Sequence, residues 1–448
     1  MKILIIGAGE VGGHLAKLLS RSNHDITVVD SNADRVNFIG ENLDVLAIEG
    51  HGTSPSLLRR AQIEKMDMLI AVTTVDEVNI LACMIAKQFG VKTKIARVRN
   101  REFSSDEIPL NLEELGIDMI IHPELEATRE IVRLIKFPQA HEIIGFCGNQ
   151  MMIVGFRVSE KAEILDVPLQ DLGKTLKDIP FRLVTITRDG STFIPGGTNK
   201  VMVDDEVYVA VLPSELPRVF KIFGHERRPT RSVMIYGATS IGRMVAQQLE
   251  GEKDIHVKLL ESERRRGELA ADQLDHTPVV IGDASDINLI AREGIVDQDV
   301  FCALTNDDEN NIVTSLLARH LQVPKTITLI GKVDYTPIVK TIGLDIAVNP
   351  RWLTSNAIFK YIHHGGIVSL RHLVNIDAET FEFIASAKSK VVGKMLRDIK
   401  FPHGSIMVAV EHEEGVELPV GDTKIFVGDK VVVFSLPNAV KGVLKLFE

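Results

Sequence analysis

The sequence predicts an α/β fold in which two doubly wound parallel-sheet domains alternate with two small α+β domains. A glycine turn between an apolar strand and a helix occurs twice, at Gly7 and at Gly237. Continuous apolar strands alternate with amphipathic helices after each turn, which is typical of a parallel sheet covered on both faces. Period-two strands and further glycine turns follow each of these regions. The chain is therefore expected to have the order A, B, A, B.

The first glycine turn, Gly7-Ala-Gly-Glu-Val-Gly12, predicts a Rossmann-like nucleotide site. Gly7 permits the tight turn, Gly9 lets the backbone approach a pyrophosphate, and Gly12 lets the helix pack closely on the strand. Asp30 ends the next predicted strand. Its carboxylate is expected to accept hydrogen bonds from ribose hydroxyls and to repel a 2′-phosphate, so NAD or an adenine nucleotide is favoured over NADP.

The remaining strands and their spacing indicate a duplication. They are predicted at residues 44–48, 68–72, 93–98 and 118–121, and again at 278–281, 300–304, 326–330 and 345–348. Segment 71–80 aligns without gaps on segment 303–312. Repeated segments of this kind predict repeated structural units.

Three polar residues are expected at the carboxyl edge of the first sheet, where ligands of this fold bind. Thr73 and Thr74 lie where the fourth strand meets its helix, and Arg97 ends the fifth strand, from which it can reach a phosphate. Two alternatives stay open. Thr74 and Glu77 match a capping box, so Thr74 can serve the helix alone, and either Arg97 or its neighbour Arg99 can be a solvated strand end.

The second glycine turn departs from the pattern at its middle position, where Thr239 replaces glycine. A Cβ there crowds the closest approach to a dinucleotide, although the hydroxyl can compensate by donating to a phosphate. Glu261 is predicted to be the ribose carboxylate of this second site, with Asp283 and Thr305 nearby. Whether a nucleotide occupies it is left open by the sequence.

The domain boundaries follow from these patterns. Predicted helices at 124–137 and 352–363 start next to prolines, which suit a first helical turn. The predicted domains are 1–123 (Rossmann-like), 124–224 (small α+β), 230–350 (Rossmann-like) and 351–448 (small α+β).

The composition of the chain argues against a nucleic-acid-binding, membrane-spanning or secreted protein. The chain has 448 residues with 61 acidic and 51 basic side chains, so no basic field for nucleic acid is predicted. Its apolar runs are of strand length, and we expect neither a membrane span nor a signal peptide. Three widely spaced cysteines predict reduced thiols in a cytosolic protein. The pair His363–His364 lacks an acidic or cysteine companion, so no metal site is predicted, and no catalytic acid, base or triad is recognised.

Several segments carry a resemblance to one family. They are Gly7 to Gly13, Ile26 to Asp30, Gly50 to Thr53, Asp67 to Thr74, Ile95 to Arg97, Gly282 to Asp286 and Leu304 to Asn310. Through them the chain resembles the TrkA family of Trk system potassium uptake proteins over nearly its whole length.

The resemblance implies TrkA-N and TrkA-C domains, each pair forming a regulator-of-potassium-conductance (RCK) unit. It also implies an RCK ring, expected as a homotetramer, beneath a TrkH/TrkG-like membrane potassium transporter on the inner face of the cell membrane. NAD(H), with ATP or ADP as the alternative, would bind and change the shape of the ring. The positions that it implies for the first nucleotide are Gly7, Ala8, Gly9, Glu10, Val11, Asp30, Thr73, Thr74 and Arg97, with Glu261 for the second.

The leading hypothesis is thus a cytosolic nucleotide-sensing regulatory subunit that gates ion flux without catalysis. Two alternatives stay open at this stage: an NAD-dependent oxidoreductase with the small domains as substrate domains, and a nucleotide-sensing module of another cation transporter.

Overall fold

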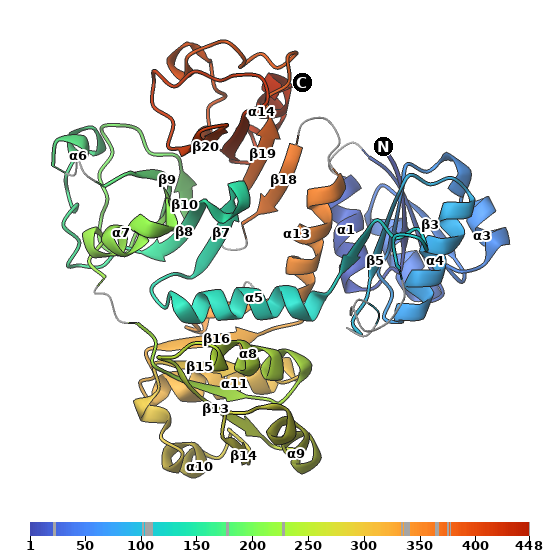
Figure 1. Cartoon of the computed structure of the whole chain (residues 1–448), viewed down its shortest axis with the longest axis horizontal. Helices are drawn as coiled ribbons and strands as arrows, with labels where there is room; N and C mark the ends of the chain where they lie inside the picture. The colour runs from blue at the N-terminus through green and yellow to red at the C-terminus, as the bar shows by residue number, and fades with distance from the viewer. Residues whose placement is uncertain are drawn as a thin grey trace.

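Four sheets follow one another along the described part of the chain (Figure 1). The computed structural model describes residues 1–20, 24–100, 103, 111–175, 179–225, 229–332, 335, 341–362, 367–373, 376 and 378–447. The pair His363–His364 lies outside the described residues. Two six-stranded parallel sheets alternate with two five-stranded antiparallel sheets, so the predicted fold class is confirmed.

The first parallel sheet has the strand order β3-β2-β1-β4-β5-β6. Its strands are β1 (Lys2–Ile6), β2 (Asp25–Asp30), β3 (Leu46–Glu49), β4 (Met68–Ala71), β5 (Thr93–Arg97) and β6 (Met119–Ile121). Its helices are α1 (Glu10–Ser20), α2 (Ala33–Asn42), α3 (Pro55–Arg60) and α4 (Asp76–Gln88). Along β1, Ile3 and Ile5 enter one apolar cluster and Leu4 and Ile6 another, which is why the strand is apolar at every position.

The second parallel sheet repeats this order as β14-β13-β12-β15-β16-β17. Its strands are β12 (Ser232–Tyr236), β13 (His256–Glu261), β14 (Val279–Ile281), β15 (Val300–Ala303), β16 (Lys325–Leu329) and β17 (Ile346–Val348). Its helices are α8 (Ser240–Glu250), α9 (Arg264–Gln273), α10 (Ile287–Arg292) and α11 (Asp308–His320). We call the two regions the first and second parallel-sheet units.

The two antiparallel sheets share one topology, β7-β8-β11-β9-β10 and β18-β19-β22-β20-β21. The first contains β7 (Glu142–Phe146), β8 (Met151–Arg157), β9 (Phe181–Arg188), β10 (Ser191–Phe193) and β11 (Glu206–Val211), with α6 (Leu169–Thr175) and α7 (Leu216–Ile222). The second contains β18 (Ile367–His372), β19 (Glu379–Ile384), β20 (Ser405–His412), β21 (Gly415–Glu417) and β22 (Lys430–Ser435), with α14 (Val440–Phe447). Apolar residues of both sheets meet in one buried cluster that includes Phe146 and Phe434.

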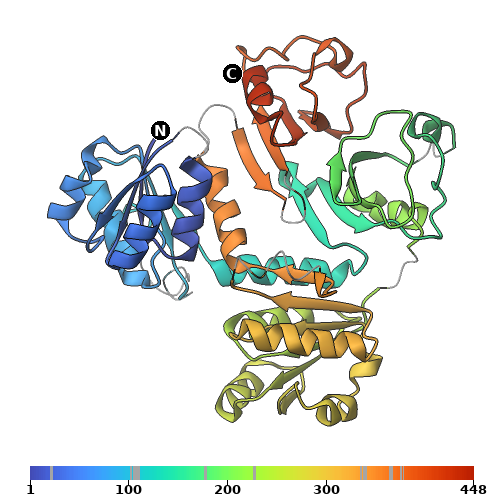
Figure 2. The ribbon, with the colours of Figure 1, turned by 180° about the vertical axis from the view of Figure 1, so that it is seen from behind.

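Two helices cross between the units. Helix α5 (Pro123–Lys136) leaves the first unit and packs on α8 of the second, where Ile131 and Ile135 join the second unit's core. Helix α13 (Pro350–Ile362) leaves the second unit and packs on α1 of the first (Figures 1 and 2). Each parallel-sheet unit is therefore completed by a helix from the other, an exchange that the sequence did not predict.

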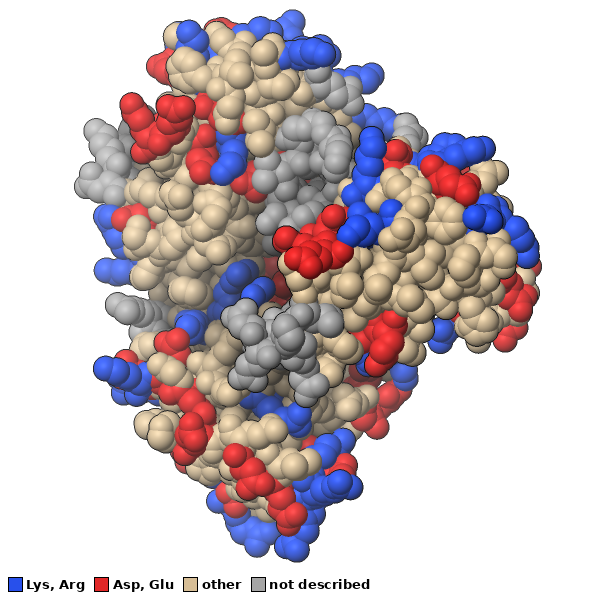
Figure 3. Space-filling view, turned by 45° about the vertical axis from the view of Figure 1, so that its right-hand side comes forward, with Lys and Arg blue, Asp and Glu red and all other residues tan. Residues whose placement is uncertain are grey.

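Acidic and basic side chains intermingle over the face shown in Figure 3. Within the described ranges, no helix has the length and apolar character needed to cross a membrane.

Candidate functional site

The first glycine turn joins β1 to α1 and leaves room beside Gly9. Gly7 has a φ of +108°, in the left-handed region that favours glycine. A Cβ on Gly12 would lie 1.8 Å from the carbonyl oxygen of Gly7, so the packing of α1 requires this glycine. A Cβ on Gly9 would approach the described neighbours no closer than 3.8 Å, at Arg35 Nη1. The protein's own packing does not require Gly9, and the space beside it is open to a ligand.

Asp30 faces this turn from the end of β2. Its Oδ2 accepts a hydrogen bond of 2.6 Å from the backbone N–H of Ala8, and its Oδ1 accepts one of 2.8 Å from Asn32. These bonds fix the carboxylate beside the glycine turn. A carboxylate offers about four acceptor positions, and Asp30 is only partly buried, so further positions remain for ribose hydroxyls.

Thr73 is held by a buried residue that the sequence analysis missed. Asn79, fully buried on α4, accepts hydrogen bonds from the backbone N–H and the hydroxyl of Thr73 at 2.9 and 2.8 Å. Its amide donates in return to the carbonyl oxygens of Thr73 and Arg97 at 3.1 and 2.8 Å. Asn79 thus joins the ends of β4 and β5. The repeated Asn-Ile pair, Asn79-Ile80 and Asn311-Ile312, was the signal that would have found it.

The capping box proposed for Thr74 is wrong. Helix α4 begins at Asp76, and its N-cap residue, Val75, makes no capping hydrogen bond through its side chain. The hydroxyl of Thr73 instead bonds the backbone of Val75, and Thr74 contributes its carbonyl oxygen to the Arg99 guanidinium. The hydroxyl that bonds the start of the helix thus belongs to Thr73, one residue before Thr74, and the helix begins one residue later than the capping box placed it.

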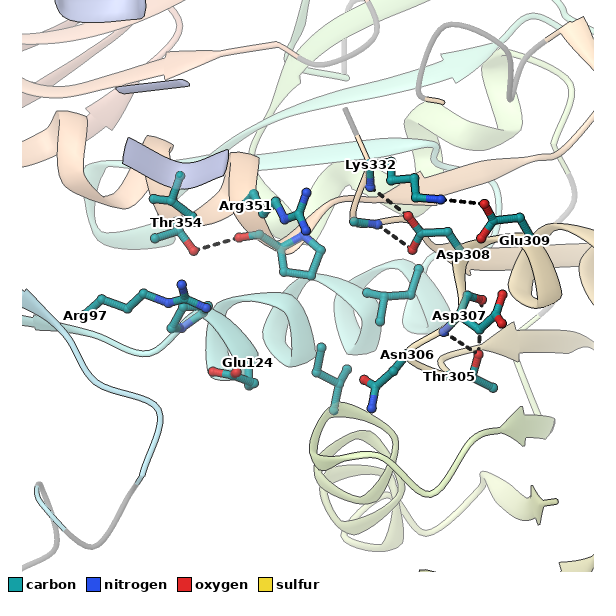
Figure 4. A pocket seen from close by; sticks show the side chains of 16 residues that line it. Arg97, Glu124, Thr305, Asn306, Asp307, Asp308, Glu309, Lys332, Arg351 and Thr354 are labelled. Atoms are coloured by element: carbon teal, nitrogen blue, oxygen red, sulfur yellow. Dashed lines mark hydrogen bonds and ion pairs between the residues drawn. The ribbon is translucent and has the colours of Figure 1, made fainter. Parts of the chain in front are cut away.

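Arg97 is partly buried rather than a solvated strand end. Burial lowers the pKa of its guanidinium, while the nearby carboxylate of Glu124 acts in the opposite direction. Its Nε is buried without a hydrogen-bond partner among the described residues. The side chain lines a cavity of about 460 Å³ together with Val11, which follows the first glycine turn (Figure 4).

The structure therefore brings the predicted first-site residues to one edge of the sheet. Gly7 packs against Thr73, Ala8 bonds Asp30, and Val11 shares the cavity with Arg97. Glu10, at the start of α1, forms an ion pair of 3.0 Å with Arg351 of the second unit. The assignment of the predicted first-site residues to a nucleotide stays a prediction.

The second glycine turn has the backbone conformation of the first, but the position that corresponds to Gly9 carries a side chain. Gly237 has a φ of +107°, and a Cβ on Gly242 would lie 2.0 Å from its carbonyl oxygen. Thr239 is buried and caps α8: its hydroxyl accepts from Gly242 N and donates to Leu304 O at 2.8 Å. The hydroxyl hydrogen that was expected to reach a phosphate is thus already used within the protein.

Glu261 is enclosed, unlike Asp30. It is 2% exposed; its Oε2 accepts from Ala238 N at 2.7 Å, and its Oε1 accepts from Glu263 N and Arg266 Nη2 at 2.8 and 3.1 Å. Burial alone would raise the pKa of this carboxyl, but the two backbone amides and Arg266 outweigh burial and lower it.

The other predicted residues of the second unit lie around the turn. Asp283 accepts from the Tyr236 hydroxyl at 3.0 Å and from Ser285 N at 2.8 Å, and the latter bond lowers its pKa. Thr305 repeats the arrangement of Thr73, because buried Asn311 accepts from its N–H and hydroxyl at 2.9 and 2.6 Å. Thr305 also lines the cavity that contains Arg97.

The sheet order, the paired glycine turns and the strand-end carboxylates define a protein of tandem Rossmann-like units. The family model of the TrkA-N domain matches residues 3–123 and 233–350, and that of the TrkA-C domain matches residues 380–448.

Relatives match along the whole chain. The chain is 34% identical to the Trk system potassium uptake protein TrkA of Azorhizobium caulinodans, over all of this chain and 98% of the relative. It is 36% identical to that of Halomonas elongata, over all of this chain and 99% of the relative. It is 35% identical to TrkA homolog 2 of Methanosarcina mazei, over the full length of both. The chain belongs to the TrkA family of potassium uptake proteins.

Solved structures of the same fold come from the GsuK channel. The RCK domain of GsuK aligns with a TM-score of 0.61 at 18% identity, covering all of this chain and 94% of that one. The GsuK channel bound to NAD aligns with a TM-score of 0.60 at 17% identity, covering all of this chain and 78% of that one. At these identities the likeness concerns the fold.

Proposed function

We propose that this chain is the nucleotide-sensing regulatory subunit of a potassium uptake transporter. The observation that carries the proposal is the open first glycine turn, where free space beside Gly9 faces a partly exposed carboxylate, Asp30. Membership of the TrkA family and the RCK fold support the link to potassium transport. No catalytic step is part of the proposal.

The proposed ligand is NAD(H) or an adenine nucleotide. Its phosphates lie at the N-terminus of α1, where free backbone amides and the helix dipole favour negative charge. Asp30 accepts the ribose hydroxyls and disfavours a 2′-phosphate by charge repulsion. Thr73 and Arg97 complete the edge of the site. The second unit, whose Glu261 is enclosed, is proposed to contribute structure rather than a second equal site.

In this proposal, ligand binding changes the shape of the ring through the exchanged helices α5 and α13. Because α13 packs on α1, any shift of the first glycine turn is passed to a helix that continues into the second small domain. A ligand that binds one arrangement better by about 1.4 kcal/mol changes the ratio of the two arrangements tenfold. A few phosphate hydrogen bonds are sufficient for such a difference.

The proposed assembly is a homotetrameric ring on the cytoplasmic face of a TrkH/TrkG-like transporter. Exposed apolar residues at matching positions support self-association of the units: Leu81 on α4 is 45% exposed and Val313 on α11 is 55% exposed.

A calorimetric titration with NADH, ADP and ATP tests the proposal. The variant Gly9→Thr gives the first turn the residue of the second; it is expected to fold, since an added Cβ would lie no closer than 3.8 Å to the described neighbours, and to lose nucleotide binding. The matched variant Thr239→Gly is the control and is expected to keep the wild-type affinity. Equal binding by the two variants contradicts the assignment to the first unit.

A second measurement addresses the reaction class. The protein is incubated with NADH and a panel of carbonyl compounds, and absorbance reports oxidation of the cofactor. The regulatory proposal expects no turnover. Turnover that disappears in Asp30→Ala would instead establish an oxidoreductase.

A further inference from the structure

Each small domain carries the same surface edge, built from two stretches of chain. One stretch follows the second strand of the domain, and the other is the turn before its last strand. They are residues 160–172 and 196–204 in the first small domain, and residues 387–399 and 420–428 in the second. Figure 1 shows the second small domain at the opposite end of the molecule from the second parallel-sheet unit.

Two equivalent contacts fix the register between these edges. Each edge has a backbone hydrogen bond from the first stretch to the turn: Asp166 N to Val201 O at 3.2 Å, and Gly393 N to Ile425 O at 2.8 Å. Each also has an isolated bridge: Pro168 with Lys200, and Met395 with Lys424. Position 393 therefore corresponds to position 166, and position 424 to position 200.

The charge of the two edges is opposite. Segment 160–172 carries four acidic side chains and one basic one, whereas segment 387–399 carries one acidic side chain and four basic ones. Glu163, for example, corresponds to Lys390. We call the two surfaces the acidic edge and the basic edge. Because their backbone contacts are the same, the fold does not require this difference in charge.

The exposed lysines of the basic edge have no carboxylate partner. Lys388, Lys394 and Lys424 are exposed, and none of them forms an ion pair within the described part of the chain. Arg397, in contrast, already pairs with Asp422. Protein–protein interfaces are enriched in arginine and depleted in lysine, so unpaired lysines favour a partner other than a protein.

Apolar side chains lie among these lysines. Phe426 is 53% exposed and Val420 is 61% exposed, and Lys424 Nζ lies 5.6 Å from the centre of the Phe426 ring. On the acidic edge the same two positions hold Met202 and Gly196. Exposed apolar residues rimmed by polar ones mark contact surfaces, and Phe beside lysine is typical of segments that lie in a membrane interface.

We propose that the basic edge binds the surface of a membrane that contains anionic lipids, with Phe426 at the level of the headgroups. The proposal goes beyond the proposed function and rests on it only for placing the chain beneath a membrane. Anionic lipids give the cytoplasmic leaflet a negative potential that attracts lysines. The cytoplasmic loops of membrane proteins carry an excess of Lys and Arg, so they repel this edge. Lipid, rather than the transporter itself, is therefore the partner.

The acidic edge adds an orientation to this contact. The same lipid surface repels its four carboxylates, so the chain meets the membrane through the second small domain and not the first. A duplicated surface has thus become two-sided through a change of charge.

Co-sedimentation of the full-length chain with vesicles tests the proposal. Binding is expected with vesicles of equal parts phosphatidylglycerol and phosphatidylcholine, and not with phosphatidylcholine alone. Added salt is expected to weaken it, because screening shortens the reach of the lysine charges. Nucleotide and transporter are both absent, so failure here leaves the proposed function in place, and failure of the nucleotide titration leaves the vesicle result in place.

A matched pair of variants locates the contact. Lys388→Gln with Lys424→Gln is expected to weaken vesicle binding about 25-fold, since each lysine near an anionic surface contributes about fivefold. Lys161→Gln with Lys200→Gln removes the same charges from the equivalent, exposed positions of the acidic edge and is expected to keep wild-type binding. Equal losses in the two double variants overturn the proposal.

A gain-of-binding variant guards against a folding artefact. Glu163→Lys with Asp166→Gly gives the acidic edge the residues of the basic edge; Asp166 has a φ of +59°, which glycine adopts freely. Vesicle binding is expected to strengthen severalfold, which a damaged protein cannot do. Phe426→Ser is expected to weaken binding severalfold at low and high salt, because salt does not screen an apolar contact.

Sedimentation velocity without vesicles examines a second copy of the chain as the partner. The assembly of Lys388→Gln with Lys424→Gln is expected to keep the wild-type mass. A smaller assembly would assign the basic edge to a contact between copies and overturn the proposal. Equal binding of the wild type to both kinds of vesicle, or to neither, also overturns it.

Discussion

Asp30 and Glu261 end equivalent strands and accept the same hydrogen bond from their glycine turns, yet their surroundings are opposite. Asp30 is partly exposed and, among the described residues, has no ion pair, whereas Glu261 is 2% exposed and pairs with Arg266. The two units therefore keep the same hydrogen bond at the turn, but the strand-end carboxylate is accessible to solvent only in the first. A few side chains, rather than the duplicated fold, decide this accessibility.

The second turn is closed by two substitutions and one ion pair. Thr239 fills the place of Gly9, and Arg243 donates to Ala238 O at 2.6 Å where the first unit has Gly13. Arg266, whose counterpart in the first unit is Arg35, pairs with the Glu261 carboxylate. Each satisfies backbone or side-chain groups that a phosphate or ribose would otherwise contact. In the second unit these groups are therefore bonded by the protein's own side chains.

The largest expected effect comes from opening the second unit. Glu261→Ala leaves Arg266 and two backbone amides without their buried acceptor, so the free energy of unfolding is expected to fall by about 3 kcal/mol. Nucleotide affinity is expected to stay at the wild-type value. Denaturant unfolding and calorimetry measure the two quantities, and a loss of affinity without a loss of stability contradicts this role for Glu261.

The first unit is expected to respond in the reverse way. Asp30→Ala removes the ribose acceptor, and nucleotide affinity is expected to fall about a hundredfold, close to 2.7 kcal/mol. Its stability changes less, because Asp30 is partly exposed. The control is calorimetry of Asp34→Ala, which removes an exposed carboxylate on α2. Equal losses of nucleotide affinity in the two variants would show that the effect comes from net charge alone.

A buried lysine gives the second unit a pH dependence that the first lacks. Lys325 donates to Ala140 O at 3.1 Å, and burial lowers its pKa from 10.5 to about 8; Thr93 stands at the equivalent position. The folded protein loses this proton near pH 8 and the unfolded chain near 10.5. Stability is therefore expected to rise between these pH values, with the full penalty present below pH 8.

Lys325→Met should raise the free energy of unfolding at pH 7 by about 2 kcal/mol and abolish this rise. Thermal unfolding at pH 7 and pH 10 measures it. Lys253→Met, at an exposed position, serves as the control and should keep the wild-type profile. A variant that still gains stability with pH contradicts the role given to Lys325.

The smallest effect is expected at the substituted glycine. Thr239→Ala removes the N-cap of α8 and its bond to Leu304, at a cost of about 1 kcal/mol. Circular dichroism during thermal unfolding detects such a change. If stability is unaffected, Thr239 is not the cap that the geometry indicates.

The sequence predicted what depends on local periodicity. Apolar strands, amphipathic helices and glycine turns identified the sheets and the A, B, A, B order, because each is encoded within a few residues of itself. The capping box at Thr74 was wrong because a matching spacing does not place a helix start, and the true start lies at Asp76.

The sequence did not predict the features that depend on contacts between distant residues. Nothing near Asn79 states that its amide will join two strand ends, and nothing in the pattern around Glu261 shows that Arg266 will cover it. Similarly, the apolar face of α5 indicates that the helix is buried but not against which unit. These depend on distant partners brought together by the complete fold.

The exchange of α5 and α13 also bears on the ancestry of the chain. A single ancestral repeat would have carried one such helix with no second unit of its own to cover. Two identical copies could bury both helices by swapping them, which is the arrangement of a domain-swapped homodimer. Fusion through the connection around residues 224–231 made the two partners one polypeptide and made their encounter independent of concentration. Two tethered units are also free to diverge in sequence, as Asp30 and Glu261 have done.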